Sequence, residues 1–95
     1  MVLLGLCQPA FAELPETTQD SFNKDVLSSS KPVVVEFSAA WCGYCKKLAP
    51  ILEDMSKNYT GRATFVKVDV DKNPMLKAQY KIGPIPRVLI FRTAK

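Results

Sequence analysis

Apolar and polar positions follow one another in a pattern that predicts three strands. The run Val33–Phe37 is β-branched and almost entirely apolar, which is typical of a strand buried on both faces. Residues 64–70 alternate between apolar and polar side chains, as expected for a second strand. Arg87–Phe91 is another apolar run and predicts a third strand. These three segments are the predicted strands of the fold.

Helical spacing fills the segments between these strands. Asp20 is expected to cap a short first helix, and Asn73-Pro74 to begin the last helix, which Gly83 can close. The middle helix is predicted from Cys42 onward. The expected buried side chains of the three helices are Phe22, Val26 and Leu27; Leu48, Ile51, Leu52, Met55 and Tyr59; and Met75, Leu76 and Tyr80. The alternation of helix and strand predicts an α/β fold with a sheet between helices.

Composition and charge narrow the class of protein. A chain of 95 residues fits one domain, and its 47% hydrophobic and 23% charged residues are typical of a globular fold rather than a disordered or membrane-embedded one. The net charge is +4, but the 13 basic residues are scattered among 9 acidic ones. Because a nucleic-acid surface needs a clustered basic stripe, we expect no nucleic-acid partner.

The first dozen residues resemble the end of an export signal. Val2–Cys7 is apolar, and Ala10-Phe11-Ala12 has the small-x-small pattern of a secretory cleavage site. Residues 1–12 are therefore interpreted as the remnant of a signal peptide, with residues 13–95 as the domain and an extracytoplasmic compartment such as the periplasm as the destination. The alternatives are an ordinary N-terminal segment of a cytoplasmic protein and a membrane tether. The apolar run is too short to span a bilayer.

Two cysteines close together carry the candidate chemistry. The chain has three cysteines and no histidine, which excludes Cys–His and Ser–His nucleophile pairs. Cys42 is placed where a strand passes into a helix, so its sulfur faces the free N–H groups of the first turn, which stabilise a thiolate and lower the cysteine pKa from about 8.5. Cys45 lies one turn later and is expected to be more buried. We therefore predict that Cys42 attacks a substrate disulfide and Cys45 resolves the mixed disulfide.

Other interpretations of the cysteine pair remain open at this point. Two chains could share a zinc site or an iron–sulfur cluster, although one chain cannot supply four Cys and His ligands. The two cysteines could also be inert core residues. A non-catalytic module could use the same surface to bind peptides without any redox chemistry.

The cysteine segment resembles the thioredoxin family. The likeness rests on Trp41–Lys46 followed by Ala49-Pro50, and on the segments Val68–Pro74 and Tyr80–Pro86, and it extends from about Asp20 to Phe91. It implies a thioredoxin-like fold, with a central mixed sheet flanked by helices. It also implies a protein-disulfide oxidoreductase whose redox-active Cys42–Cys45 disulfide replaces any bound cofactor or metal.

The resemblance also implies roles for individual residues. Glu36 matches a buried acid beneath the disulfide, with a raised pKa suited to moving a proton to or from Cys45, and Lys67 on the adjacent strand is its expected partner. The family's cis-proline corresponds to Pro86, so the backbone of Ile85 would pair with a substrate peptide. The remaining contact surface would be formed by Trp41, Gly43 and Tyr44. The implied partners are proteins with disulfides or thiols, and an electron donor or acceptor still to be identified; the chain itself is expected to be a monomer.

Three departures from the family pattern affect these expectations. Gly43-Tyr44 stands where thioredoxins usually carry Gly-Pro; it resembles periplasmic disulfide isomerases, so reductase, isomerase and oxidase all remain open. Arg87 replaces the usual Thr after the cis-proline. The sequence stops at Lys95 without a counterpart of the family's last strand and helix, which predicts a C-terminally short domain with Arg87–Phe91 at an edge of the sheet.

Overall fold

The computed structural model describes residues 14–93, which form six elements. A short π-helix, η2, is followed by three strands and two α-helices in alternation. Their bounds are η2 (Asn23–Leu27), β1 (Val33–Ser38), α1 (Gly43–Asn58), β2 (Thr64–Asp69), α2 (Pro74–Gln79) and β3 (Arg87–Phe91). The order confirms the α/β fold, and the bounds of β3 coincide with those expected from the sequence.

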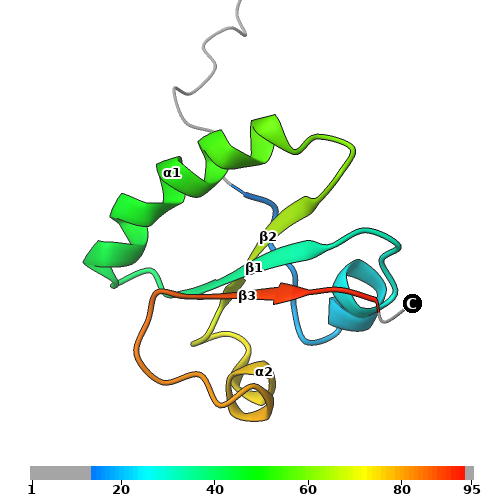
Figure 1. Ribbon diagram of the computed structural model, residues 1–95. Helices are drawn as coiled ribbons and strands as arrows, with labels where there is room; N and C mark the ends of the chain where they lie inside the picture. The colour runs from blue at the N-terminus through cyan, green and yellow to red at the C-terminus, as the bar shows by residue number, and fades with distance from the viewer. Residues whose placement is uncertain (1–13, 94–95) are drawn as a thin grey trace, which may run out of the picture.

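β1 lies at the centre of a mixed sheet in the order β2-β1-β3 (Figure 1). It pairs parallel to β2 and antiparallel to β3. In this register Glu36 of β1 stands between Lys67 of β2 and Val88 of β3. Among the described residues β3 therefore has one unpaired edge.

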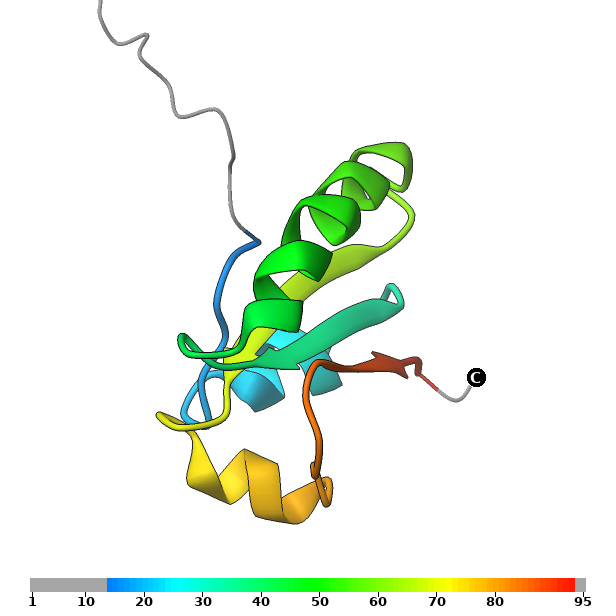
Figure 2. The ribbon, with the colours of Figure 1, turned by 90° about the vertical axis from the view of Figure 1, so that its left-hand side faces the viewer.

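Helices cover both faces of the sheet. Figure 2 shows α1 on one side of the sheet and α2 on the other. Side chains alternate along a strand, so Val33, Val35 and Phe37 join the core formed with η2 and α2, while Val34 packs beneath α1. The same alternation directs Glu36 toward the α1 face, where the cysteines lie.

Several helix residues expected to be buried are exposed instead, namely Leu27, Ile51, Met55, Tyr59 and Met75. In α1 only the line of Leu48 and Leu52 rests on the apolar cluster beneath the helix. In η2 the N–H of Ser28 bonds to the carbonyl of Asn23, five residues back, so the wider turn rotates Leu27 away from the face that Phe22 and Val26 bury.

The predicted helix ends also differ in detail. The N-cap of η2 is Phe22 rather than Asp20, and no side chain caps that helix. At the other end, α2 stops at Gln79, and Lys81 takes the left-handed conformation (φ 52°) that the sequence assigned to Gly83. The chain therefore leaves α2 two residues earlier than expected, and Gly83 lies in the loop that faces Trp41.

Candidate active site

Cys42 forms the N-cap of α1, directly after the loop that leaves β1. Its backbone is extended (φ −83°, ψ 110°), and its Sγ accepts a hydrogen bond of 3.1 Å from the backbone N–H of Cys45. Ser, Thr, Asp and Asn usually supply the acceptor at this position. Here the sulfur satisfies one of the free amides at the positive end of the helix, as the sequence predicted.

Cys42 and Cys45 are joined in a disulfide, with their Cα atoms 5.2 Å apart. The expected difference in burial is wrong, because each residue exposes only 4% of its surface. Because only one turn of helix separates them, the two cysteines are buried to the same extent. The two cysteines differ instead in polar contact, since the hydrogen bond from the backbone is made to the sulfur of Cys42.

Glu36 lies in the core beneath the cysteines and exposes 2% of its surface. Burial removes water from the carboxylate and so raises the pKa of Glu36 above its ordinary value of 4.5, while the charge of Lys67 offsets part of this rise. Among the described residues, its Oε2 has no hydrogen-bond partner. The structure therefore provides a buried acid with spare capacity to accept or donate a proton.

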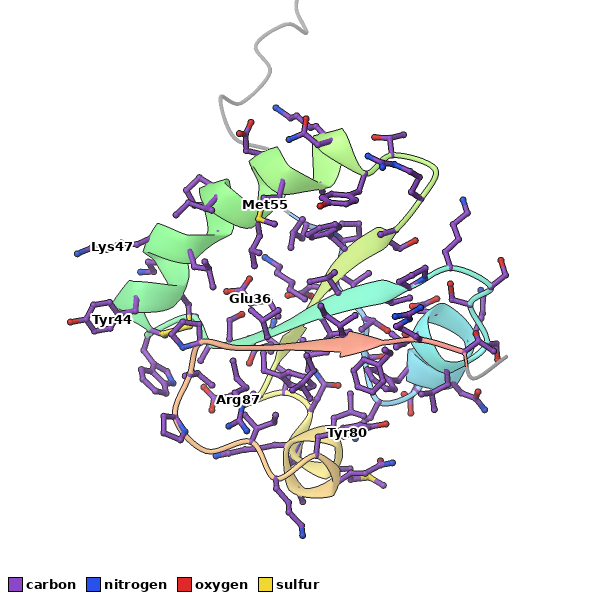
Figure 3. All side chains as sticks on the ribbon, in the orientation of Figure 1. Glu36, Tyr44, Lys47, Met55, Tyr80 and Arg87 are labelled. Carbon is purple, nitrogen blue, oxygen red and sulfur yellow. A yellow bond between two sulfur atoms is a disulfide. The ribbon has the colours of Figure 1, made fainter. Side chains whose placement is uncertain are left out.

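A pocket of about 360 Å³ joins this acid to the disulfide. Glu36, Lys67 and Cys45 all contribute to its lining. We name it the Glu36 pocket. Figure 3 shows Glu36 directed to the side of the sheet on which α1 lies. The pocket brings the predicted proton carrier, its cationic neighbour and the resolving cysteine together in one space.

Trp41 is a largely exposed ring beside the disulfide, with 69% of its surface accessible. Its Nε1–H donates a hydrogen bond of 2.8 Å to Oδ2 of Asp71. Asp71 is positioned in turn by its backbone N–H, which donates to Oδ1 of Asp69 at 2.9 Å. Trp41 and Ile85 line a second hollow of about 290 Å³, which we name the Trp41 hollow. The indole is thus held by a polar contact rather than by core packing.

The remaining predicted contact residues lie around the same site. Tyr44 exposes 73% of its surface, and Nζ of Lys47 lies 5.6 Å from the centre of its ring. Gly43 is the first residue of α1, and the position where a β-carbon would stand has no atom within 4 Å. The Ile85–Pro86 peptide bond is cis. The expected surface of Trp41, Gly43, Tyr44, Ile85 and Pro86 is therefore accessible in part.

Two residues that support this site were missed in the sequence. Asp71 accepts the hydrogen bond from Trp41. In the sequence, the signal that could have identified Asp71 was its position two residues after Asp69 in the segment Val68–Pro74. Asn73 is buried, and its amide accepts from the N–H of Gln19 at 2.8 Å and donates to the carbonyl of Asp69 at 2.9 Å. Since Gln19 lies 54 residues earlier, no local pattern could reveal that contact.

Residues 14–93 contain neither a candidate metal site nor a membrane-spanning helix. No group of three or more Cys, Asp or Glu side chains there is arranged to hold a metal ion. None of the helices in the same range has the length and apolar character needed to cross a bilayer. Cys7 lies outside the described residues.

A cysteine pair at the start of a helix, sharing a pocket with a buried acid, defines a thiol–disulfide exchange site. The family described as thioredoxin matches residues 13–95. The chain is 49% identical over 78 residues to a thioredoxin of Acidithiobacillus ferridurans, covering 82% of this chain and 72% of that protein. It is 41% identical over 78 residues to a thioredoxin of Rickettsia felis, covering 82% and 74%.

A longer relative is the bifunctional thioredoxin reductase/thioredoxin of Mycobacterium leprae, 44% identical over 77 residues, which are 81% of this chain and 17% of that protein. The chain belongs to the thioredoxin family. It is a protein-disulfide oxidoreductase whose redox group is its own cysteine pair, and the chemistry of this family requires no bound cofactor.

Proposed function

We propose that the chain, in its dithiol form, reduces disulfides in other proteins. The observation that carries this proposal is the position of Cys42 Sγ at the N-cap of α1, in contact with a helix amide. A helix N-terminus favours the thiolate, and the thiolate is the form that attacks a disulfide. The reaction needs no group beyond the two sulfurs and a proton carrier.

The reaction proceeds in two exchanges. The thiolate of Cys42 attacks one sulfur of the substrate disulfide, the substrate S–S bond breaks, and the leaving sulfur takes up a proton. Cys45 then gives its proton to Glu36 and attacks Sγ of Cys42, which breaks the mixed disulfide and forms the Cys42–Cys45 disulfide. The second substrate sulfur leaves as a thiolate and takes up a proton from water. Two electrons pass from the protein dithiol to the substrate, which leaves as two thiols.

Substrate docking is assigned to the surface between Trp41 and the cis-proline. The Trp41 hollow would receive a side chain next to the substrate cysteine, and the backbone of Ile85 would pair with the peptide in an extended conformation. Tyr44, exposed between the cysteines, would contact the peptide from the other side. Disulfide isomerase activity is the alternative that the Gly43-Tyr44 dipeptide supports.

Cysteine variants test this function. Cys42→Ser should abolish the reduction of insulin in an assay in which dithiothreitol regenerates the dithiol form, because the attacking sulfur is lost. Cys45→Ser should instead accumulate mixed disulfides on Cys42, since nothing resolves them, and mass spectrometry would locate the adduct. Turnover by Cys42→Ser at the wild-type rate would refute the assignment. Peptide binding that survives loss of both thiols, without any turnover in the wild type, would identify a binding module instead.

A thioredoxin reductase is the proposed electron donor, supported by the relative that combines both activities in its name. We also propose that the protein is exported, on the strength of the Ala10-Phe11-Ala12 pattern. Cell fractionation and N-terminal sequencing test this proposal. A mature protein that begins at Glu13 supports export, and an intact N-terminus in the cytoplasm contradicts it.

A further inference from the structure

Four exposed cations surround the mouth of the site. Lys46 and Lys47 follow Cys45 in the first turns of α1, Lys77 of α2 lines the Trp41 hollow, and Arg87 begins β3 directly after Pro86. We name these four residues the basic rim. They come from three elements that are separate in the sequence, so the cluster is visible only in the fold.

The register of the sheet explains why Arg87 belongs to this rim. Arg87 pairs with Phe37, and β1 ends one residue later and leads to Cys42. Because β3 runs antiparallel to β1, the beginning of β3 and the end of β1 lie at the same end of the sheet. In Figure 3, Arg87 lies at this end of β3 on the side of the sheet that faces α2, and Tyr44 and Lys47 extend outward from the start of α1.

The carboxylates near the rim offset only part of its charge. Asp71, which lines the same hollow as Lys77, accepts the hydrogen bond of Trp41, and Asp69 accepts from the backbone N–H groups of Asp71 and Lys72. These donors are uncharged, so two negative charges stand against the four cations of the rim. Within residues 14–93, none of the four rim cations forms an ion pair. Lys47 is held above the ring of Tyr44, at the edge of the site, by a contact of 5.6 Å. The rim therefore presents a net positive charge to an approaching peptide.

From this arrangement we infer that the site prefers protein substrates with Asp or Glu beside the reacting cysteine. This inference rests on the proposed function and adds the class of substrate. Complementary charge at the edge of a contact raises the association rate and disfavours partners of the same charge. Arg87 determines part of this preference, because it stands next to the cis-proline where the peptide backbone is expected to dock.

Matched peptides test the inference. Each carries one cysteine in a mixed disulfide with 2-mercaptoethanol, and the residues on both sides of the cysteine are Glu, Gln or Lys. The second-order rate constant for reduction by the reduced protein is measured at low and at high salt. We expect the Glu peptide to react about threefold or more faster than the Gln peptide, and the Lys peptide slower, with the differences shrinking at high salt.

Two variants with the same loss of charge separate the rim from the net charge of the chain. Arg87→Gln should lower the Glu-to-Gln rate ratio by about twofold. Lys31→Gln, two residues before the start of β1 and so at the other end of that strand from the cysteines, should leave that ratio unchanged. Equal rates for the three peptides, or equal effects of the two variants, would overturn the inference while leaving the proposed function intact. Failure of every peptide to react with the wild type would refute the proposed function itself.

Discussion

The burial of Glu36 lowers the stability of the folded protein, although the same residue is the proposed proton carrier of the site. Its pKa is raised because the core removes water from the carboxylate, and the charge of Lys67 only partly compensates. The folded protein therefore holds the proton of this group to a higher pH than the unfolded chain does. At a pH above the pKa that Glu36 has in the unfolded chain, folding must either bind a proton to Glu36 or bury its negative charge. Either one costs free energy.

Replacing Glu36 with Gln should raise the free energy of unfolding at neutral and alkaline pH. Well below pH 4.5, the ordinary pKa of the group, the carboxyl is protonated in both states and the pH-dependent difference vanishes. As pH rises toward the higher folded pKa, the wild type loses stability and the variant does not. Urea unfolding of the oxidised proteins across this range measures the difference.

A matched control is Asp54→Asn, which removes an exposed carboxylate from α1. Because this variant keeps Glu36, it should lose stability with rising pH as the wild type does. If Glu36→Gln lost stability relative to the wild type at alkaline pH, the buried carboxylate would have to be charged and well paired, contrary to this account. Glu36→Gln should also form the Cys42–Cys45 disulfide more slowly than the wild type, since Gln cannot take the proton of Cys45.

The elements around the site are connected by Asn73, at the N-cap of α2. Replacing it with Ala would leave the N–H of Gln19 without its partner and remove one of the two hydrogen bonds to the carbonyl of Asp69, at a cost of about 1–3 kcal/mol. Chemical denaturation measures this loss. Asn58→Ala, at the exposed last residue of α1, should change stability by less than about 0.5 kcal/mol. Equal effects of the two substitutions would mean that the link through Asn73 does not stabilise the fold.

Elements with an unbroken apolar run could be predicted from the sequence. Arg87–Phe91 was bounded correctly, and β1 extends only to Ser38 beyond the apolar run. Helix faces were predicted less well, because periodicity shows which side of α1 is apolar but not which part of that side the sheet covers. The cysteines, Glu36 and Lys67 were identified from local patterns and the family resemblance. Asn73 was not, because its partner lies in a distant segment.

At the scale of the whole molecule, the direction of electron flow depends on the relative stability of the dithiol and disulfide forms. We propose a reductase, so equilibration with a glutathione buffer should give a potential near that of thioredoxins, about −270 mV. A value near that of protein disulfide isomerase, about −180 mV, would instead favour isomerase activity. Gel-shift alkylation of the equilibrated protein measures the fraction oxidised.

The most direct test of the account is the pH dependence of alkylation in the fully reduced protein, with each adduct located by mass spectrometry. Cys42 should be modified before Cys45, and its rate should reach half of its maximum at a pH below that of a free cysteine, about 8.5, because α1 stabilises its thiolate. Preferential modification of Cys45, or equal modification of both cysteines with the pH profile of a free thiol, would contradict the central claim that Cys42 is the attacking sulfur.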